Sequence, residues 1–177
     1  IYFLDGARSM VERQDYLIPY YRGQPFFDKP ALTYWLIAAS FQAFGFTLAA
    51  ARLVSALVAL LVLITTVWLG LQLFDRRTAI YGGIILATTL GFVSFGRLAM
   101  SDMLLTFWST LAMALAVAAF RDGAASGWYI PALGAVLGLG FQTKGPVALV
   151  LPGLGILAVL WQRRRQRWPI TLWQLLL

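Results

Sequence analysis

The sequence predicts an all-α fold, a polytopic transmembrane helix bundle with amphipathic juxtamembrane helices in its first outer loop. Two observations concern composition: 60% of the 177 residues are hydrophobic and only 12% are charged. A soluble domain is nearer half apolar and a quarter charged. The third observation is the arrangement, because the apolar residues gather in runs of the length that crosses a bilayer, about 20 residues.

The residue types that are missing limit the chemistry. The chain has no cysteine and no histidine, so it has no disulfide framework and lacks both the commonest general base and the commonest metal ligand. Acid–base or metal chemistry therefore falls to the seven carboxylates. The net charge of +7 does not indicate a nucleic acid partner. Four of the basic residues form one block after an apolar run, which is typical of membrane orientation.

Residues 1–46 are predicted to form an outer loop with two interfacial helices. The first helix covers about residues 2–14 and lies on the membrane surface. Apolar residues recur there at helical spacing, namely Leu4, Ala7, Met10 and Val11. Residues 20–25 are predicted to be a turn-rich connector.

The second interfacial helix is predicted at residues 31–46. It is apolar with a weak polar stripe, and at about 16 residues it is slightly short for a span. The adjacent aromatic residues Tyr34 and Trp35 are typical of the membrane interface. We therefore expect this helix to lie flat, while a tilted crossing is the alternative that its length leaves open.

Residues 47–177 are predicted to form a transmembrane bundle of about five spans. The apolar runs that predict these spans are 48–74, 79–96, 103–120, 128–142 and 146–161. A further apolar run begins at residue 170. We expect the chain to be a piece of a longer polytopic protein, without its N-terminal span and its C-terminal part.

Basic residues predict the orientation of the spans, because basic loops stay on the cytoplasmic side. The basic block that follows Trp161 is therefore expected inside. Counting back one span at a time places Lys144 outside, Arg121 inside and Asp102 outside. Arg76 then falls inside again, so the three basic loops agree with one another.

Three ionisable sites stand at the ends of apolar runs: Asp28 with Lys29, Arg97 with Asp102, and Lys144. Each site also has a structural interpretation. Asp28 and Lys29 can be an ion pair at the start of a helix, and Asp102 can cap the next helix. Lys144 can extend its side chain to the membrane interface. The functional interpretation is that ionisable residues beside the membrane core mark a functional path. If the second interfacial helix lies flat, the sites share the outer face, and we predict that they form one pocket for an anionic, lipid-linked donor.

A set of short motifs stands in a fixed order along the chain. They are Ala7-Arg8-Ser9-Met10, Asp15-Tyr16-Leu17-Ile18-Pro19, Gly23-Gln24-Pro25-Phe26-Phe27-Asp28-Lys29-Pro30, Tyr34-Trp35, Ala51-Arg52-Leu53, Asp102 and Thr143-Lys144-Gly145. In sequence and order these motifs resemble those of the bacterial branch of the protein O-mannosyltransferase and 4-amino-4-deoxy-L-arabinose lipid A transferase family, and the resemblance covers nearly the whole chain.

The resemblance implies a GT-C membrane glycosyltransferase of the bacterial inner (plasma) membrane. Such an enzyme takes a sugar from a polyprenyl-phosphate donor and works on the extracytoplasmic face, so the expected partners are this donor and membrane lipids. The acceptor would be a lipid, a glycan or a protein. Neither the acceptor nor the sugar follows from the residues.

The resemblance also implies roles for the ionisable sites. In the family, the lysine matched by Lys29 contacts the donor phosphate, and we expect Lys144 and Arg97 to neutralise the same phosphate. Asp102 matches an aspartate that lines the active site and is the candidate catalytic residue. Asp28 matches an acid that has been linked to metal binding, so a divalent metal ion is the one cofactor that the residues suggest.

One part of the family pattern is absent from the chain. The family's principal catalytic acid lies in an Asp-Glu motif ahead of the first amphipathic helix, whereas Asp5 lies within that helix and does not match it. We therefore expect the general base upstream of residue 1 and expect this piece alone to be inactive. The alternative function is a polytopic transporter or flippase for a lipid-linked or anionic substrate, which would place charges in mid-span and break its helices.

Overall fold

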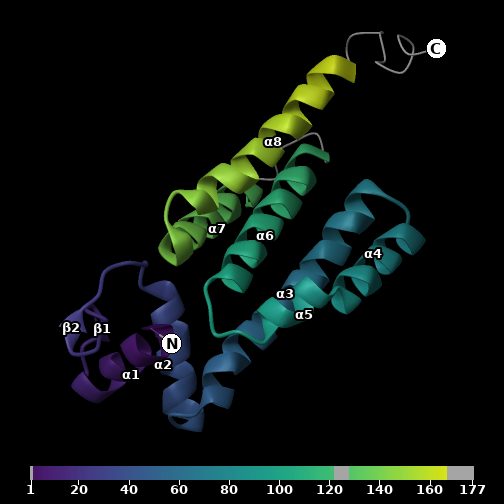
Figure 1. The fold of residues 1–177 in the computed structure, drawn as a ribbon. Helices are drawn as coiled ribbons and strands as arrows, with labels where there is room; N and C mark the ends of the chain where they lie inside the picture. Colours follow the sequence, from purple (N-terminus) through teal and green to yellow (C-terminus); the bar gives the residue numbers. More distant parts are fainter. Residues whose placement is uncertain (1, 122–127, 167–177) are drawn as a thin grey trace.

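The computed structural model describes residues 2–121 and 128–166, which form eight helices and one short hairpin (Figure 1). In chain order these are α1 (Tyr2–Arg13), β1 (Tyr20–Tyr21), β2 (Gln24–Pro25), α2 (Leu32–Phe44), α3 (Leu48–Leu73), α4 (Arg76–Thr88), α5 (Leu90–Gly96), α6 (Asp102–Arg121), α7 (Tyr129–Lys144) and α8 (Val147–Gln166). The predicted all-α class is confirmed. The apolar run predicted from residue 170 lies outside the described residues.

Helix α1 is amphipathic, as its sequence predicts, and its apolar face packs on α2. Phe3, Ala7 and Met10 are buried in one cluster with Tyr34 of α2. Gly6 permits the close approach of the two helices, because a Cβ at this position would lie 2.6 Å from the Tyr34 ring. The predicted periodicity therefore corresponds to a real face, and a glycine fixes the distance at which that face packs.

The connector between α1 and α2 is tied back onto α1. Strands β1 and β2 pair antiparallel around Arg22 and Gly23, whose φ angles of 52° and 80° suit a tight hairpin turn. The backbone N–H of Arg22 donates to the Asp5 carboxylate at 3.1 Å. That of Tyr20 donates to the Ser9 hydroxyl at 3.0 Å. Asp5 and Ser9 of α1 therefore hold the hairpin in place.

The run predicted as one span at 79–96 forms two helices, α4 and α5, which are bent by 65° at Thr89. The hydroxyl groups of Thr88 and Thr89 donate to the carbonyl groups of Ile84 and Ile85, one turn back. Such side-chain bonding competes with the backbone ladder and bends helices. Periodicity and length alone did not predict this bend.

The other predicted spans correspond to single helices. Among the described residues, α3 and α6 are long and apolar enough to cross a membrane, and the bent α4–α5 pair is a third candidate if it counts as one span. The runs 128–142 and 146–161 appear as α7 and α8, and the stretch Val147–Ala158 of α8 is apolar. Helix α6 packs against α3 on one side and against α7 and α8 on the other.

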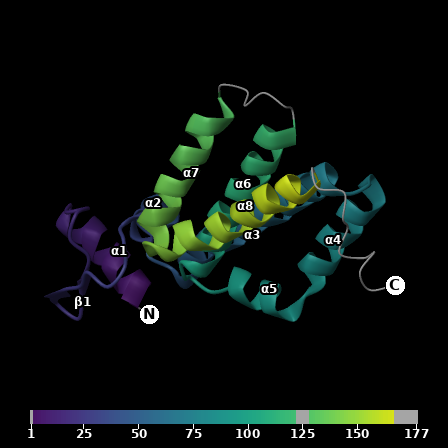
Figure 2. The ribbon, with the colours of Figure 1, turned by 90° about the horizontal axis from the view of Figure 1, so that it is seen from above.

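The hairpin, α1 and α2 gather at one end of the long helices (Figures 1 and 2). The turn between α7 and α8 and the loop between α5 and α6 face this same end (Figure 1). Helix α2 has 13 residues and is therefore about 20 Å long, which is less than the hydrocarbon core of about 30 Å. The Ser40 hydroxyl of α2 donates to the carbonyl group of Ala50 in the first turn of α3, at 2.7 Å. This geometry agrees with a flat α2, which stays a prediction.

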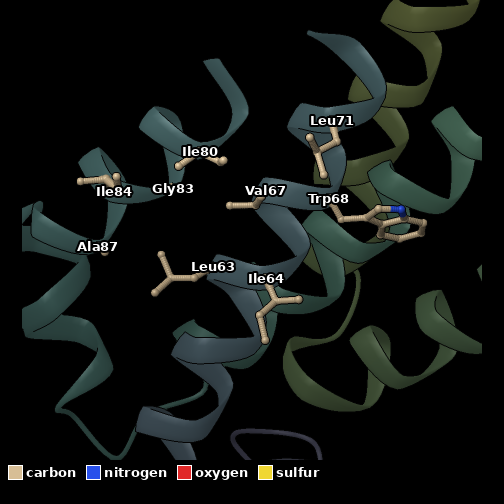
Figure 3. Close-up of a pocket in the computed structure, with 9 residues that line it drawn as sticks. All are labelled: Leu63, Ile64, Val67, Trp68, Leu71, Ile80, Gly83, Ile84 and Ala87. Atoms are coloured by element: carbon tan, nitrogen blue, oxygen red, sulfur yellow. The ribbon is translucent and has the colours of Figure 1, made fainter. Parts of the chain in front are cut away.

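An apolar groove of about 570 Å³ lies between the second half of α3 and α4 (Figure 3). Leu63 and Val67 of α3 point toward α4 in this view. Gly83 lets the two helices approach, since a Cβ there would lie 2.6 Å from Val67. No charged residue lines the groove, so it is separate from the ionisable sites that the sequence singles out.

Candidate functional site

The chain's only two lysines, Lys29 and Lys144, line one pocket. The pocket has a volume of about 630 Å³ and lies between the segment that leads into α2 and the turn between α7 and α8. Asp28 is the third ionisable residue in its wall. The rest of the lining is Leu17, Pro19, Phe27, Pro30, Ala31, Gly145, Pro146 and Val147. The fold therefore joins two of the predicted sites that are far apart in the sequence.

Lys29 is paired with its neighbour Asp28. Its Nζ lies 2.9 Å from Asp28 Oδ2, and its side chain is 29% exposed while that of Asp28 is 51% exposed. The hydrogen bond to Asp28 raises the pKa of Lys29, partial burial acts against this, and the charges of Asp28 and Asp102 add to the rise. Lys29 is therefore a stable cation, and Asp102 belongs to the same electrostatic environment.

Lys144 is paired with Asp102, which reaches it from a different helix. Lys144 ends α7 and Asp102 begins α6, and Nζ lies 2.5 Å from Oδ1. Both side chains are about two-thirds buried, at 29% and 32% exposure. Gly145, with φ of 66°, ends α7 and turns the chain toward α8, a conformation that favours glycine. The third predicted site, the Asp102 end of α6, is thus connected to the pocket through Lys144.

A buried hydrogen bond holds the two helices together next to this ion pair. Trp108 Nε1 of α6 donates to Thr143 Oγ1 at 3.0 Å, and the Thr143 hydroxyl donates to the Leu139 carbonyl group at 3.0 Å. Thr143 is fully buried. A Cβ at Gly140 would lie 3.3 Å from the Trp108 Cβ, so α7 approaches α6 closely here. Our sequence analysis did not identify this contact, although Thr143 precedes Lys144 directly and both contacts join the same pair of helices.

Arg97 is not part of the lysine pocket. It caps the end of α5 and lines a different cavity, of about 450 Å³, together with Arg52 of α3. The structure therefore brings together Asp28, Lys29 and Lys144, connects Asp102 to them, and places Arg97 elsewhere.

The carboxylates at the pocket do not form a donor set that fits a metal ion. Asp28 is bonded to Lys29 and Asp102 to Lys144. Over residues 2–121 and 128–166, no group of three carboxylates is close enough together to hold a metal. Asp28 as a metal ligand stays a prediction that this geometry does not support.

The arrangement suits an anion with an apolar part. Each lysine has a carboxylate partner that holds its ammonium group in position, and an ammonium has three donors. Each lysine can therefore keep its aspartate and still donate to a phosphate oxygen. Most of the other residues in the lining are apolar or proline, which suits the apolar part of such a ligand.

Comparison with known proteins gives the family of the chain. The family model described as dolichyl-phosphate-mannose-protein mannosyltransferase matches residues 28–177. The undecaprenyl phosphate-alpha-4-amino-4-deoxy-L-arabinose arabinosyl transferase of Aeromonas salmonicida (strain A449) is 34% identical over 168 residues, which is 92% of this chain and 30% of the relative. The transferase 2 of the same description from Sodalis glossinidius (strain morsitans) is 34% identical over 174 residues, 94% of this chain and 30% of the relative.

The fold is also similar to that of solved structures. The crystal structure of ArnT from Cupriavidus metallidurans in the apo state matches with a TM-score of 0.83 and 24% identity, over 98% of this chain and 32% of that chain. The same protein bound to undecaprenyl phosphate matches with a TM-score of 0.79 at 24% identity, over 97% of this chain and 32% of that chain. This likeness shows the fold, a polytopic helix bundle of the GT-C type, and the chain spans about a third of these proteins. Because the family model covers most of its residues, the chain belongs to the dolichyl-phosphate-mannose-protein mannosyltransferase family.

Proposed function

We propose that this chain forms the donor-phosphate part of a glycosyltransferase that moves a sugar from a polyprenyl phosphate to a lipid, glycan or protein acceptor. The observation that carries the proposal is that both lysines of the chain line one pocket at the end of an apolar helix bundle. Transfer from such a donor leaves a phosphate that gains negative charge as the sugar–oxygen bond breaks. Fixed cations stabilise this charge most in a site with little water.

Lys29 and Lys144 are the groups that bind the donor phosphate in this proposal. They approach the pocket from opposite sides, one ahead of α2 and one at the end of α7. Lys29 is kept protonated by Asp28, and Lys144 is held by Asp102. Since the cations are already in place before the donor arrives, little reorganisation is needed during the reaction.

Asp102 is the active-site carboxylate of the chain. Its bond to Lys144 orients one phosphate-binding group, and its position allows it to orient an acceptor hydroxyl beside the donor. The general base that removes the proton from the acceptor is expected upstream of residue 1. A divalent cation at Asp28 is a separate hypothesis, which a titration of donor binding with Mg²⁺ and Mn²⁺ tests directly.

The proposed location is the extracytoplasmic face of the bacterial plasma membrane. Basic residues lie at the far ends of α3 and α8, with Arg76 and Arg77 after α3 and residues 163–165 near the end of α8, and the positive-inside rule assigns these ends to the cytoplasm. The segment ahead of α2 and the turn between α7 and α8 line the lysine pocket, and both lie at the other end of these helices, toward α1 and α2 (Figure 1). The relatives are named as transferases that use undecaprenyl phosphate, which supports a donor with a long polyprenyl tail.

The test measures release of radiolabelled sugar from polyprenyl phosphate by the full-length protein. We expect Lys29→Ala and Lys144→Ala each to lower the rate about a hundredfold or more, the size of effect seen when one charge-stabilising group is removed from an active site. Arg76→Ala is the matched control, because it removes a cation at the far end of the bundle and should leave the rate unchanged. Full activity of Lys29→Ala would contradict the proposal.

The same preparation separates transfer from transport. A transporter or flippase would move the labelled lipid or its anionic headgroup across vesicles without breaking the sugar–phosphate bond. The bend at Thr89 is the kind of broken helix that transporters use. Arg97 caps the second half of the bent pair, but the lysine pocket lies at helix ends, which favours transfer.

A further inference from the structure

Arg52 and Arg97 form a second basic site, separate from the lysine pocket. They line one cavity of about 450 Å³ together with Ala49, Leu53, Ala56 and Gly96. Arg52 comes from the first turns of α3, and Arg97 caps the end of α5. We propose that this cavity binds the phosphate headgroup of a membrane lipid.

Small residues give the cavity its shape. Gly96 is buried, and a Cβ there would lie 3.3 Å from the Ala59 Cβ of α3. The end of α5 therefore lies close to α3, and this brings an arginine from each helix to the same place. Ala49 and Ala56 have side chains too small to fill the space beside the two guanidinium groups.

The two arginines meet without a counter-charge among the residues that line the cavity. Both are exposed, and no carboxylate is part of the lining. Asp102, the carboxylate closest to Arg97 along the chain, is already bonded to Lys144. Two like charges directed at one hollow repel each other, and a bound anion removes this repulsion. Guanidinium groups bind phosphate oxygens with two parallel hydrogen bonds, which makes phosphate the anion that fits best.

The surroundings select a lipid rather than a soluble phosphate. Helix α3 is a candidate membrane span, and large apolar side chains are exposed near Arg52 and Arg97 in the sequence, namely Leu57 and Leu60 of α3, Phe95 of α5 and Leu98 just after α5. Arg52 lies about one turn into α3, or about 6 Å from its start, where an arginine reaches the headgroup region. Basic pockets between transmembrane helices are known to take lipid headgroups. A phosphate at the arginines would therefore have its acyl chains beside these apolar side chains.

A lone arginine at a helix end would be explained as a side chain that extends to the membrane interface. That explanation does not require two arginines from separate helices to line the same hollow, nor small residues that keep the hollow open. This second site contains neither Lys29 nor Lys144, the two residues that line the lysine pocket, and binding of a lipid there does not depend on the activity of the protein.

Native mass spectrometry of the full-length protein in a neutral detergent tests the proposal. The probes are dioctanoyl phosphatidic acid, which carries a phosphate and two acyl chains, dioctanoylglycerol, which lacks the phosphate, and inorganic phosphate. The variants are Arg52→Gln, Arg97→Gln and the double variant, with Arg76→Gln as the control for loss of a distant charge. Lys29→Ala is measured in parallel, because the lysine pocket can also retain phosphatidic acid.

We expect the double variant to bind one phosphatidic acid about tenfold or more weakly than the unaltered protein, because two charge-assisted donors are lost. Dioctanoylglycerol binding should not change, and the adduct that Lys29→Ala removes should persist in the double arginine variant. Equal retention of phosphatidic acid by the unaltered protein and the double variant would overturn the proposal. If inorganic phosphate bound as tightly as phosphatidic acid, the choice of a lipid as the ligand would be overturned. If the double variant lost dioctanoylglycerol binding as much as phosphatidic acid binding, recognition of the phosphate would be overturned.

Discussion

Lys144 donates a hydrogen bond to Asp102 across 2.5 Å, and this bond joins the last residue of α7 to the first residue of α6. Lys144 also lines the pocket that holds Lys29. The position of one phosphate-binding group thus depends on a carboxylate that comes from another helix. A half-buried pair of this kind is costly to break from one side, because the remaining charge loses its partner.

Asp102→Asn tests this dependence. The change removes the charge that holds Lys144, so we expect the transfer rate to fall at least about tenfold and the free energy of unfolding to fall by about 1–2 kcal/mol. Transfer kinetics and thermal unfolding measure the two effects. Lys144→Gln and the double variant complete a double-mutant cycle, and strictly additive losses in transfer rate would show that the pair does not act as a unit.

The Trp108–Thr143 hydrogen bond should position Lys144 without touching the donor. Thr143→Val removes the acceptor of the partly buried Trp108 N–H, which costs about 1 kcal/mol of stability. We expect a lower maximal rate together with weaker donor binding, because the end of α7 shifts. Thr143→Ser keeps the hydroxyl and should retain most of the activity. If Thr143→Val were less stable but had an unchanged rate and donor affinity, the bond would be structural only.

Much of this architecture could be predicted from the sequence, since it depends on periodicity and on charge at helix ends. The apolar spacing of Ala7 and Met10 predicted the face on which α1 packs, and long apolar runs predicted α3 and α6. Counting basic loops placed Lys144 and Asp102 on one side, where the structure pairs them. These features depend on local sequence or on the alternation of spans between the two sides of the membrane. They can therefore be predicted without knowing how the helices pack.

The rest depends on packing that a single sequence does not contain. Arg97 stands at a helix end on the predicted side, but its direction depends on the bend at Thr89 and on the contact of Gly96 with α3. It therefore lies beside Arg52 rather than Lys29. The contact between Trp108 and Thr143 depends likewise on the rotation of α6 against α7. Hydropathy predicts how far along a span a residue lies. Tertiary contacts decide toward which neighbouring helix its side chain points.

Gly6→Ala tests the packing of α1 on α2. The new Cβ would lie 2.6 Å from the Tyr34 ring, so the helices must separate, and we expect a loss of about 1–3 kcal/mol. Gly134→Ala is the control, because a Cβ there meets nothing within 4 Å, and alanine favours a helix by about 1 kcal/mol over glycine. Thermal unfolding of both variants measures the difference. Equal stability of the two would show that α1 does not pack as closely as described.

Donor binding should depend on pH through Lys29. Its pKa is raised, first by the hydrogen bond to Asp28, so the charged form is favoured in the folded protein. The stability that this pairing contributes is fully present below the ordinary lysine pKa of about 10.4 and is lost as pH rises through the raised value. Asp28→Asn removes the main cause of the rise, so we expect donor binding to weaken at a lower pH than in the unaltered protein. Isothermal titration with polyprenyl phosphate at several alkaline pH values measures this shift, with Glu12→Gln as a control for an exposed carboxylate outside the pocket lining. Identical pH profiles for Asp28→Asn and the unaltered protein would mean that Asp28 does not control the charge of Lys29.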